Sequence, residues 1–156
     1  MPSTPPWLKH TITVYLVVWF VGSFWIGALV KSEAITHLLG VPLVSFKPYV
    51  YYGLAGAIGG TLYALRLFHE FYDRFSKRWV LYYLLRPITC AGAAVMTIIL
   101  FQSGILLLQT GSTVQAKIGI AFLVGFGYGK VMEKLKTMTE VLFSESKEPR
   151  PPDHSA

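Results

Sequence analysis

Charged residues divide this chain into long apolar stretches and shorter polar segments. No charge occurs from residue 11 to residue 30, and a helix of about 20 apolar residues spans the roughly 30 Å hydrocarbon core of a bilayer. Three later stretches are similarly poor in charge. The pattern predicts an all-α integral membrane bundle of four transmembrane helices, at about 11–30, 50–68, 79–107 and 113–130.

The first helix follows a short, proline-rich leader at residues 1–10, which we expect to be cytoplasmic. Lys9 precedes the apolar stretch, as a basic residue does in a signal peptide. The apolar part of a signal peptide usually has about 7–15 residues, and this stretch is longer. We therefore expect the first helix to be retained, with a cleaved signal peptide as the alternative.

Residues 31–49 are too interrupted to cross a membrane, because Gly40, Pro42 and Pro48 fall among them. Ser32 suits the N-cap of a short helix that Gly40 would end. We expect a small amphipathic helix in the membrane interface here. A re-entrant helix is the alternative, and it would need surrounding protein to cover its backbone.

After residue 130 the apolar pattern becomes one-sided. Apolar residues recur there every three or four positions, at Val131, Leu135, Met138 and Leu142. This spacing predicts that the fourth helix continues as an amphipathic cytoplasmic helix over 131–143, whose stripe contacts a partner protein or another copy. Residues 144–156 have the composition of a disordered tail.

Small residues spaced by four occur in several of the predicted helices. Such stripes let two helix backbones approach closely, which favours association where no hydrophobic effect operates between helices. The partner helix is in the same chain or in another copy. The predicted helix-packing residues are Gly53, Gly56, Gly60, Ala64, Gly92, Ala121, Gly125 and Gly129.

The formal net charge of +6 raises the question of nucleic acid binding. We do not expect a nucleic acid partner, because the basic residues cluster beside stretches long enough to span a bilayer. With four spans, eleven Lys and Arg residues fall on the side of the 66–87 connector and three on the other. The positive-inside rule therefore predicts cytoplasmic N- and C-termini.

The 66–87 connector is rich in basic and aromatic residues. We expect its cations to contact anionic lipid at the cytoplasmic face, and its rings to form an interfacial belt. The cations are Arg66, Arg74, Lys77, Arg78 and Arg86, and the rings are those of Trp79, Tyr82 and Tyr83.

Arg86 is the most costly residue to place in the membrane, at about 2.5–3.5 kcal/mol at a helix centre. It directly precedes Pro87, which we expect to kink the third helix. Arg86 either extends to the headgroups or binds a lipid phosphate, another anion or a carboxylate such as that of Glu133.

Two motifs partly match known sites of chemistry. His69, Glu70 and Asp73 lie together, but a zincin motif needs a second histidine where Asp73 stands, and the acids have basic neighbours. Residues 124–129, VGFGYG, are similar to a potassium-channel filter, but Leu123 replaces its threonine and a glycine packing stripe explains the same residues. We predict no catalytic residue, no metal site and no cofactor.

Three segments carry a resemblance to a known family: YYGLAGAIGGTLYALR, KRWVLYYLLRP and AFLVGFGYGKVMEKL. Together they resemble an uncharacterised family of small bacterial multi-span membrane proteins, over residues 49–143. The resemblance implies a multi-pass protein of a bacterial inner membrane. It implies no activity and no site residues.

These observations predict a small non-enzymatic membrane protein. Its partners are the bilayer, with anionic lipid, and other copies of the chain in a homo-oligomer. One hypothesis is that the oligomer forms a pore or ion pathway. The alternative is a non-conducting scaffold or accessory subunit that binds a cytoplasmic protein or anionic lipid through its basic face.

Overall fold

The computed structural model describes residues 5–33, 37–38, 41–72, 75, 79–104 and 113–143. Within these residues the chain is helical, apart from a minimal antiparallel pairing of β1 (His37–Leu38) with β2 (Val41–Pro42) and a 3-10 turn, η1 (Leu43–Ser45). The prediction of an all-α fold is confirmed. The helices are α1 (Pro6–Lys31), α2 (Lys47–Glu70), α3 (Val80–Gln102), α4 (Val114–Phe126) and α5 (Tyr128–Phe143).

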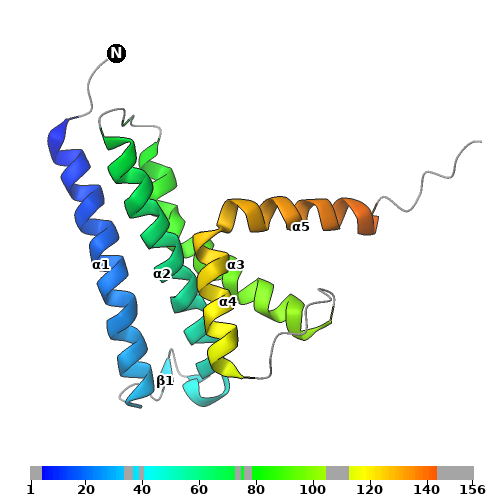
Figure 1. Ribbon diagram of the computed structural model, residues 1–156. Helices are drawn as coiled ribbons and strands as arrows, with labels where there is room; N and C mark the ends of the chain where they lie inside the picture. Colours follow the sequence, from blue (N-terminus) through cyan, green and yellow to red (C-terminus); the bar gives the residue numbers. More distant parts are fainter. Residues whose placement is uncertain are drawn as a thin grey trace, which may run out of the picture.

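Helices α1 to α4 alternate in direction, and α2 lies at the centre in contact with the other three (Figure 1). Two hydrogen bonds tie the start of α1 to the end of α2 and to α3. Lys9 Nζ donates to the carbonyl of Tyr72 at 2.6 Å, and the Tyr15 hydroxyl donates to the carbonyl of Leu84 at 2.8 Å. The end with these contacts is called the Lys9 end below.

The core is divided along α2 into two clusters. Near the Lys9 end, Ile12 and Leu16 of α1 pack with Phe68 of α2 and Tyr83 of α3. Towards the opposite end, aromatic and aliphatic side chains join α2, α3 and α4, and the buried members are Tyr52, Ala55, Ala94, Ile98, Ala121 and Val124. α1 therefore borders only the first cluster.

Among the described helices, α1 and α3 are long and apolar enough to cross a membrane. α2 has a comparable length of 24 residues but is less apolar, because glycine and tyrosine fill many of its positions. α4 is apolar but has only 13 residues. Pro87 lies inside α3, whose last described helical residue is Gln102.

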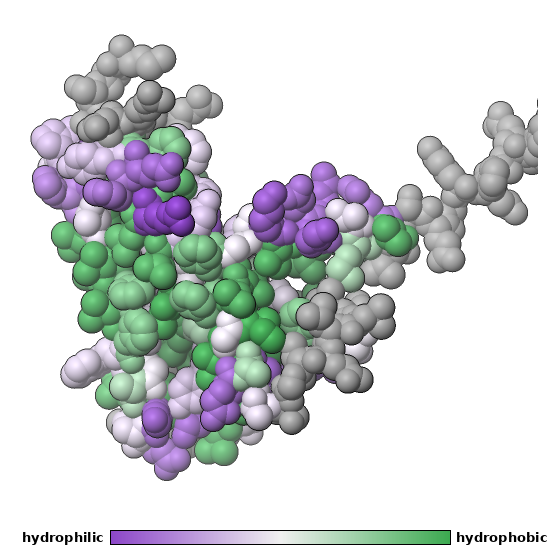
Figure 2. Space-filling view, in the orientation of Figure 1, coloured by the Kyte–Doolittle hydropathy of each residue, from purple (hydrophilic) through white to green (hydrophobic). Residues whose placement is uncertain are grey.

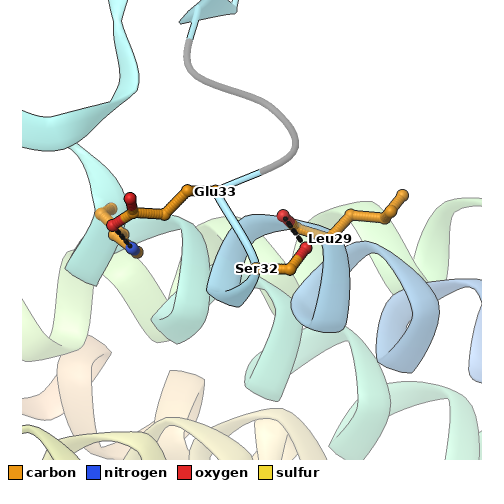
Figure 3. A network of polar contacts seen from close by, with 4 residues as sticks. Leu29, Ser32 and Glu33 are labelled. Atoms are coloured by element: carbon orange, nitrogen blue, oxygen red, sulfur yellow. Dashed lines mark hydrogen bonds and ion pairs between the residues drawn. The ribbon is translucent and has the colours of Figure 1, made fainter.

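The region after α1 differs from its prediction. Ser32 does not begin a helix, because its hydroxyl donates to the carbonyl of Leu29 at 3.1 Å and closes α1 (Figure 3). Glu33 then adopts a positive φ of 59° and pairs with Lys47 at 3.3 Å. Residues 37–38 are extended, so the predicted amphipathic helix from Ser32 to Gly40 is wrong. At its other end, α1 begins at Pro6, inside the predicted leader.

The prediction of one continuous fourth helix is also wrong. α4 ends at Phe126, and its last turn closes with a 2.8 Å hydrogen bond from the Gly127 N–H to the carbonyl of Leu123. α5 then leaves at a steep angle (Figure 1). Gly125, Gly127 and Gly129 make this stretch a poor helix former, which explains why the axis changes here. The predicted tail at 144–156 and most of the leader lie outside the described residues.

Candidate functional site

Glycines on two sides of α2 bring three helices into backbone contact. A Cβ atom on Gly56 would lie 2.7 Å from the carbonyl oxygen of Cys90 in α3, and one on Gly60 would lie 2.6 Å from the Cys90 side chain. A Cβ atom on Gly125 of α4 would overlap the carbonyl of the same Gly56. Three of the predicted packing glycines thus meet helices of the same chain.

The other small residues predicted to pack between helices differ in burial and in how close their neighbours lie. Ala64 and Ala121 are fully buried, and a Cβ on Gly53 would make only an ordinary 3.5 Å contact with Val95. Gly92 and Gly129 have no described neighbour within 4 Å of a Cβ position. Gly59, which the stripe did not include, meets the backbone of Phe122 in α4.

Arg86 is buried among aromatic rings. Only 5% of the residue is exposed, although its side chain carries a full charge. The guanidinium carbon lies 4.5 Å from the ring centre of Tyr63 in α2, 5.0 Å from that of Tyr82 in α3 and 5.7 Å from that of Tyr128 in α5. These three rings are called the tyrosine cage below.

Helix periodicity explains why this arginine points inward. Tyr83, Arg86 and Cys90 are three and four residues apart, so they share the face of α3 that packs on α2. Gly60 lies opposite and leaves room for that face to approach. Tyr63 follows Gly60 by one turn, which brings its ring against the guanidinium.

The charge of Arg86 has no carboxylate partner among the described residues. The ion pairs in that part of the chain are Glu33–Lys47, Lys130–Glu133 and Lys136–Glu140. Its Nε atom is buried without a hydrogen-bond partner. Aromatic faces attract a cation, but they do not neutralise it. Arg86 is therefore a buried cation with an unused donor.

A pocket of about 290 Å³ opens beside the Arg86 side chain, and it is called the Arg86 pocket below. Its walls come from α2, α3 and the junction of α4 with α5. Glu133, the carboxylate named among the alternative partners of Arg86, lines this pocket but pairs with Lys130 at 3.2 Å. The lining residues are Tyr63, Tyr82, Arg86, Phe126, Gly127, Gly129, Lys130 and Glu133.

The remaining predicted surface residues occupy different environments. Arg66 is exposed and Trp79 is half-exposed, whereas Tyr83 is buried against Phe68 and Phe75. Tyr82 belongs to the tyrosine cage. Arg74, Lys77 and Arg78 lie outside the described residues.

The stripe of α5 borders a second space, the α5 groove. Val131, Leu135 and Met138 are half-buried there, opposite residues of α3 and α4. The side chain of Leu142 lies outside the described part of the chain. The groove has a volume of about 450 Å³ and a mainly apolar lining, and Lys130 borders both it and the Arg86 pocket.

The sequence pointed to Arg86 through the free-energy cost of placing its charge in a membrane. It did not reveal Tyr63 and Tyr128 as neighbours of Arg86. Tyr63 carried a usable signal, because it lies three residues after Gly60 and so shares the helix face on which the neighbouring helix packs. Tyr128 carried none, because its position depends on the break at Gly127. In a continuous fourth helix, as the sequence pattern predicts, Tyr128 would not be placed beside Arg86.

The described residues contain no group of three or more His, Cys, Asp or Glu side chains that could hold a metal ion. His69 and Glu70 are exposed, and Asp73 is outside the described part. Comparison with protein-family models, with curated proteins and with solved structures finds no match to this chain.

Proposed function

We propose that the protein is a four-span membrane protein whose Arg86 pocket binds a phosphate group at the cytoplasmic face. The membrane location is supported by the two long apolar helices and by the surface. In Figure 2 an apolar band crosses the middle of the molecule between polar ends, and α5 lies along one edge of this band with its polar side turned away. α4 rises only about 20 Å, a shortfall that local thinning of the bilayer accommodates.

The proposed orientation rests on the distribution of charge. Among the described residues, six cations belong to the Lys9 end or to α5: Lys9, Arg66, Arg86, Lys130, Lys134 and Lys136. Lys31, Lys47 and Lys117 belong to the opposite end. The excess favours a cytoplasmic Lys9 end, and the alternating helices then bring both termini to that side.

The observation that carries the phosphate proposal is the buried, unpaired guanidinium of Arg86. An isolated cation in a poorly solvated site costs several kcal/mol unless an opposite charge joins it. The guanidinium fork suits a phosphate, which accepts two parallel hydrogen bonds. Lys130 adds a second cation at the wall of the pocket. The three rings hold the guanidinium in place without taking up its hydrogen-bonding capacity.

The glycine contacts favour a non-conducting protein over a pore. Gly56, Gly60 and Gly125 make contacts between α2, α3 and α4 of one chain. Packing within the chain therefore accounts for these stripes without a second copy. We propose a binding or accessory role in which the basic face holds anionic lipid or a soluble phosphate compound.

Two binding measurements test this proposal. Purified protein in nanodiscs of zwitterionic lipid with added phosphatidylglycerol is analysed for retained lipid by native mass spectrometry. In parallel, protein in uncharged detergent is titrated with inorganic phosphate while its thermal unfolding is followed. The variants are Arg86→Gln and Arg86→Lys, and Lys117→Gln serves as a control at the opposite end.

Wild type and Lys117→Gln should retain phosphatidylglycerol or be stabilised by phosphate, and Arg86→Gln should lose the response. Arg86→Lys should keep a weaker response, because a lysine supplies charge without the fork. A response to phosphate alone identifies a soluble ligand, and a response to lipid alone identifies a headgroup. Equal behaviour of wild type and Arg86→Gln in both measurements would overturn the proposal.

A further inference from the structure

The α5 groove lies next to the Arg86 pocket, and its chemistry differs from that of the pocket. The lining of the groove includes Phe101 of α3, Leu123 of α4 and Leu135 of α5. Its polar members are Lys130, Lys134 and Thr97. A space with this lining suits a hydrocarbon chain better than a polar ligand.

The break at Gly127 creates this groove. Because α5 leaves the axis of α4, its apolar stripe does not pack fully on a neighbouring helix. Val131, Leu135 and Met138 stay half-buried at the edge of the groove. Leu123 of α4 is 63% exposed, so apolar surface remains uncovered on both walls.

Lys130 connects the two spaces, because its side chain borders both. Lys134, one turn further along α5, adds a second cation to the groove. An amphiphile with a phosphate at one end and a hydrocarbon chain at the other would therefore meet cations and then apolar walls. Neither inorganic phosphate nor a soluble phosphate compound would use the groove.

We propose that the α5 groove holds an acyl chain of an anionic phospholipid whose phosphate occupies the Arg86 pocket. This inference rests on the proposed function and specifies its ligand. α5 then acts as a clamp that covers the chain with its apolar stripe and faces the headgroup region with its lysines. The bound molecule is a resident lipid with two points of attachment, unlike the lipids around the exposed face of α1.

Photo-crosslinking tests the location of the chain. The probe is phosphatidylglycerol with a diazirine group in one acyl chain, in nanodiscs of zwitterionic lipid with full-length protein. Crosslinked peptides are identified by mass spectrometry. We expect several-fold more crosslinking at Phe101, Leu135 and Met138 than at Val18 and Trp25, which are exposed on α1.

Two variants on α5 make the test specific. Leu135→Ser together with Met138→Ser should reduce crosslinking in the groove several-fold. Val141→Ser should not, because Val141 is on the same helix but 71% exposed and is not among the residues that line the groove. Arg86→Gln should also reduce crosslinking at the groove, since the headgroup would lose its partner.

The result separates this inference from the proposed function. If lipid retention depends on Arg86 but crosslinks are spread evenly over α1 and the groove, the acyl-chain site is overturned and the phosphate site stands. If neither lipid retention nor the response to inorganic phosphate depends on Arg86, both are overturned. Protein–protein crosslinks between copies at Leu135, in place of lipid adducts, would assign the groove to a second copy and also overturn the acyl-chain site.

Discussion

Gly125 of α4 lies directly on the backbone of Gly56 in α2, so that a Cβ atom on Gly125 would overlap the Gly56 carbonyl. The same Gly56 faces Cys90 of α3. One glycine therefore sets the separation of three helices. In the proposed membrane bundle, where close packing replaces the hydrophobic effect as the main force between helices, this contact should be central to stability.

Replacing Gly125 by alanine should destabilise the bundle by about 1–3 kcal/mol, the usual cost of overpacking a tight core. The measurement is the free energy of unfolding in mixed detergent micelles with increasing dodecyl sulfate. Gly92→Ala is the matched control, because a Cβ there meets no described atom within 4 Å. The control should be neutral or slightly stabilising, since alanine is the better helix former. Equal effects of the two changes would contradict the contact.

The sequence predicted the helices better than it predicted which helices the glycines contact. Periodicity and length were enough to find α1, α2 and α3, because a long apolar stretch with few charges has few alternatives to a helix. The spacing of Gly56, Gly60 and Gly125 indicated close packing but not the partner, since a stripe looks the same whether it meets its own chain or a copy. That information depends on how each helix is rotated in the bundle.

Prediction from local sequence was wrong where one residue type suits two different structural roles. Ser32 has the chemistry of an N-cap, but in the structure it closes α1 through the Leu29 carbonyl. The glycines from 125 to 129 read as a packing stripe in a continuous helix, yet Gly127 ends α4. The position of Tyr128 beside Arg86 follows from that break and was out of reach of sequence reasoning. Arg86 itself was identified, because the cost of a charge in hydrocarbon does not depend on the details of packing.

The tyrosine cage predicts a difference between two substitutions at Tyr63. Tyr63→Phe keeps the ring over the guanidinium of Arg86, so its unfolding free energy should stay close to that of wild type. Tyr63→Leu removes the ring face and should cost about 1–2 kcal/mol in the same unfolding assay, as expected for a desolvated cation–π contact. In an Arg86→Gln background the difference between the two variants should shrink. A difference that persists there would assign the effect to packing alone.

Replacing Thr97 by valine should stabilise the protein. The Thr97 Oγ1 atom is buried without a hydrogen-bond partner, whereas Thr61 and Thr89 each donate to a carbonyl one turn earlier. Valine has nearly the same shape and no hydroxyl to desolvate. Thr97→Val should therefore raise the unfolding free energy by about 1 kcal/mol. It should also leave lipid retention unchanged, because the groove binds a hydrocarbon chain. Reduced retention would show that the hydroxyl contacts the ligand.

The break between α4 and α5 predicts a distance that spin labels can measure. In a Cys90→Ala background, labels at Thr113 and Thr139, 26 positions apart, would be about 39 Å apart along a continuous helix. With the break, the distance from pulsed electron resonance should be clearly shorter. Labels at Trp7 and Trp25, both in α1, provide the straight-helix control, expected at about 27 Å. A Thr113–Thr139 distance near 39 Å would mean that the fourth helix continues without a bend.

The proposed topology predicts which surface positions react from which side of the membrane. Single cysteines at His10, Glu33, Thr113 and Thr139, all exposed, are placed in the Cys90→Ala background. An impermeant maleimide should label Glu33→Cys and Thr113→Cys in spheroplasts. His10→Cys and Thr139→Cys should react only in inverted vesicles, because four crossings return both ends to the cytoplasm. The mass of the purified chain also tests the cleavage alternative, since a removed first helix would take the His10→Cys label with it. Labelling of Glu33→Cys and Thr139→Cys from the same side would exclude the four-span arrangement, and with it the cytoplasmic placement of the Arg86 pocket.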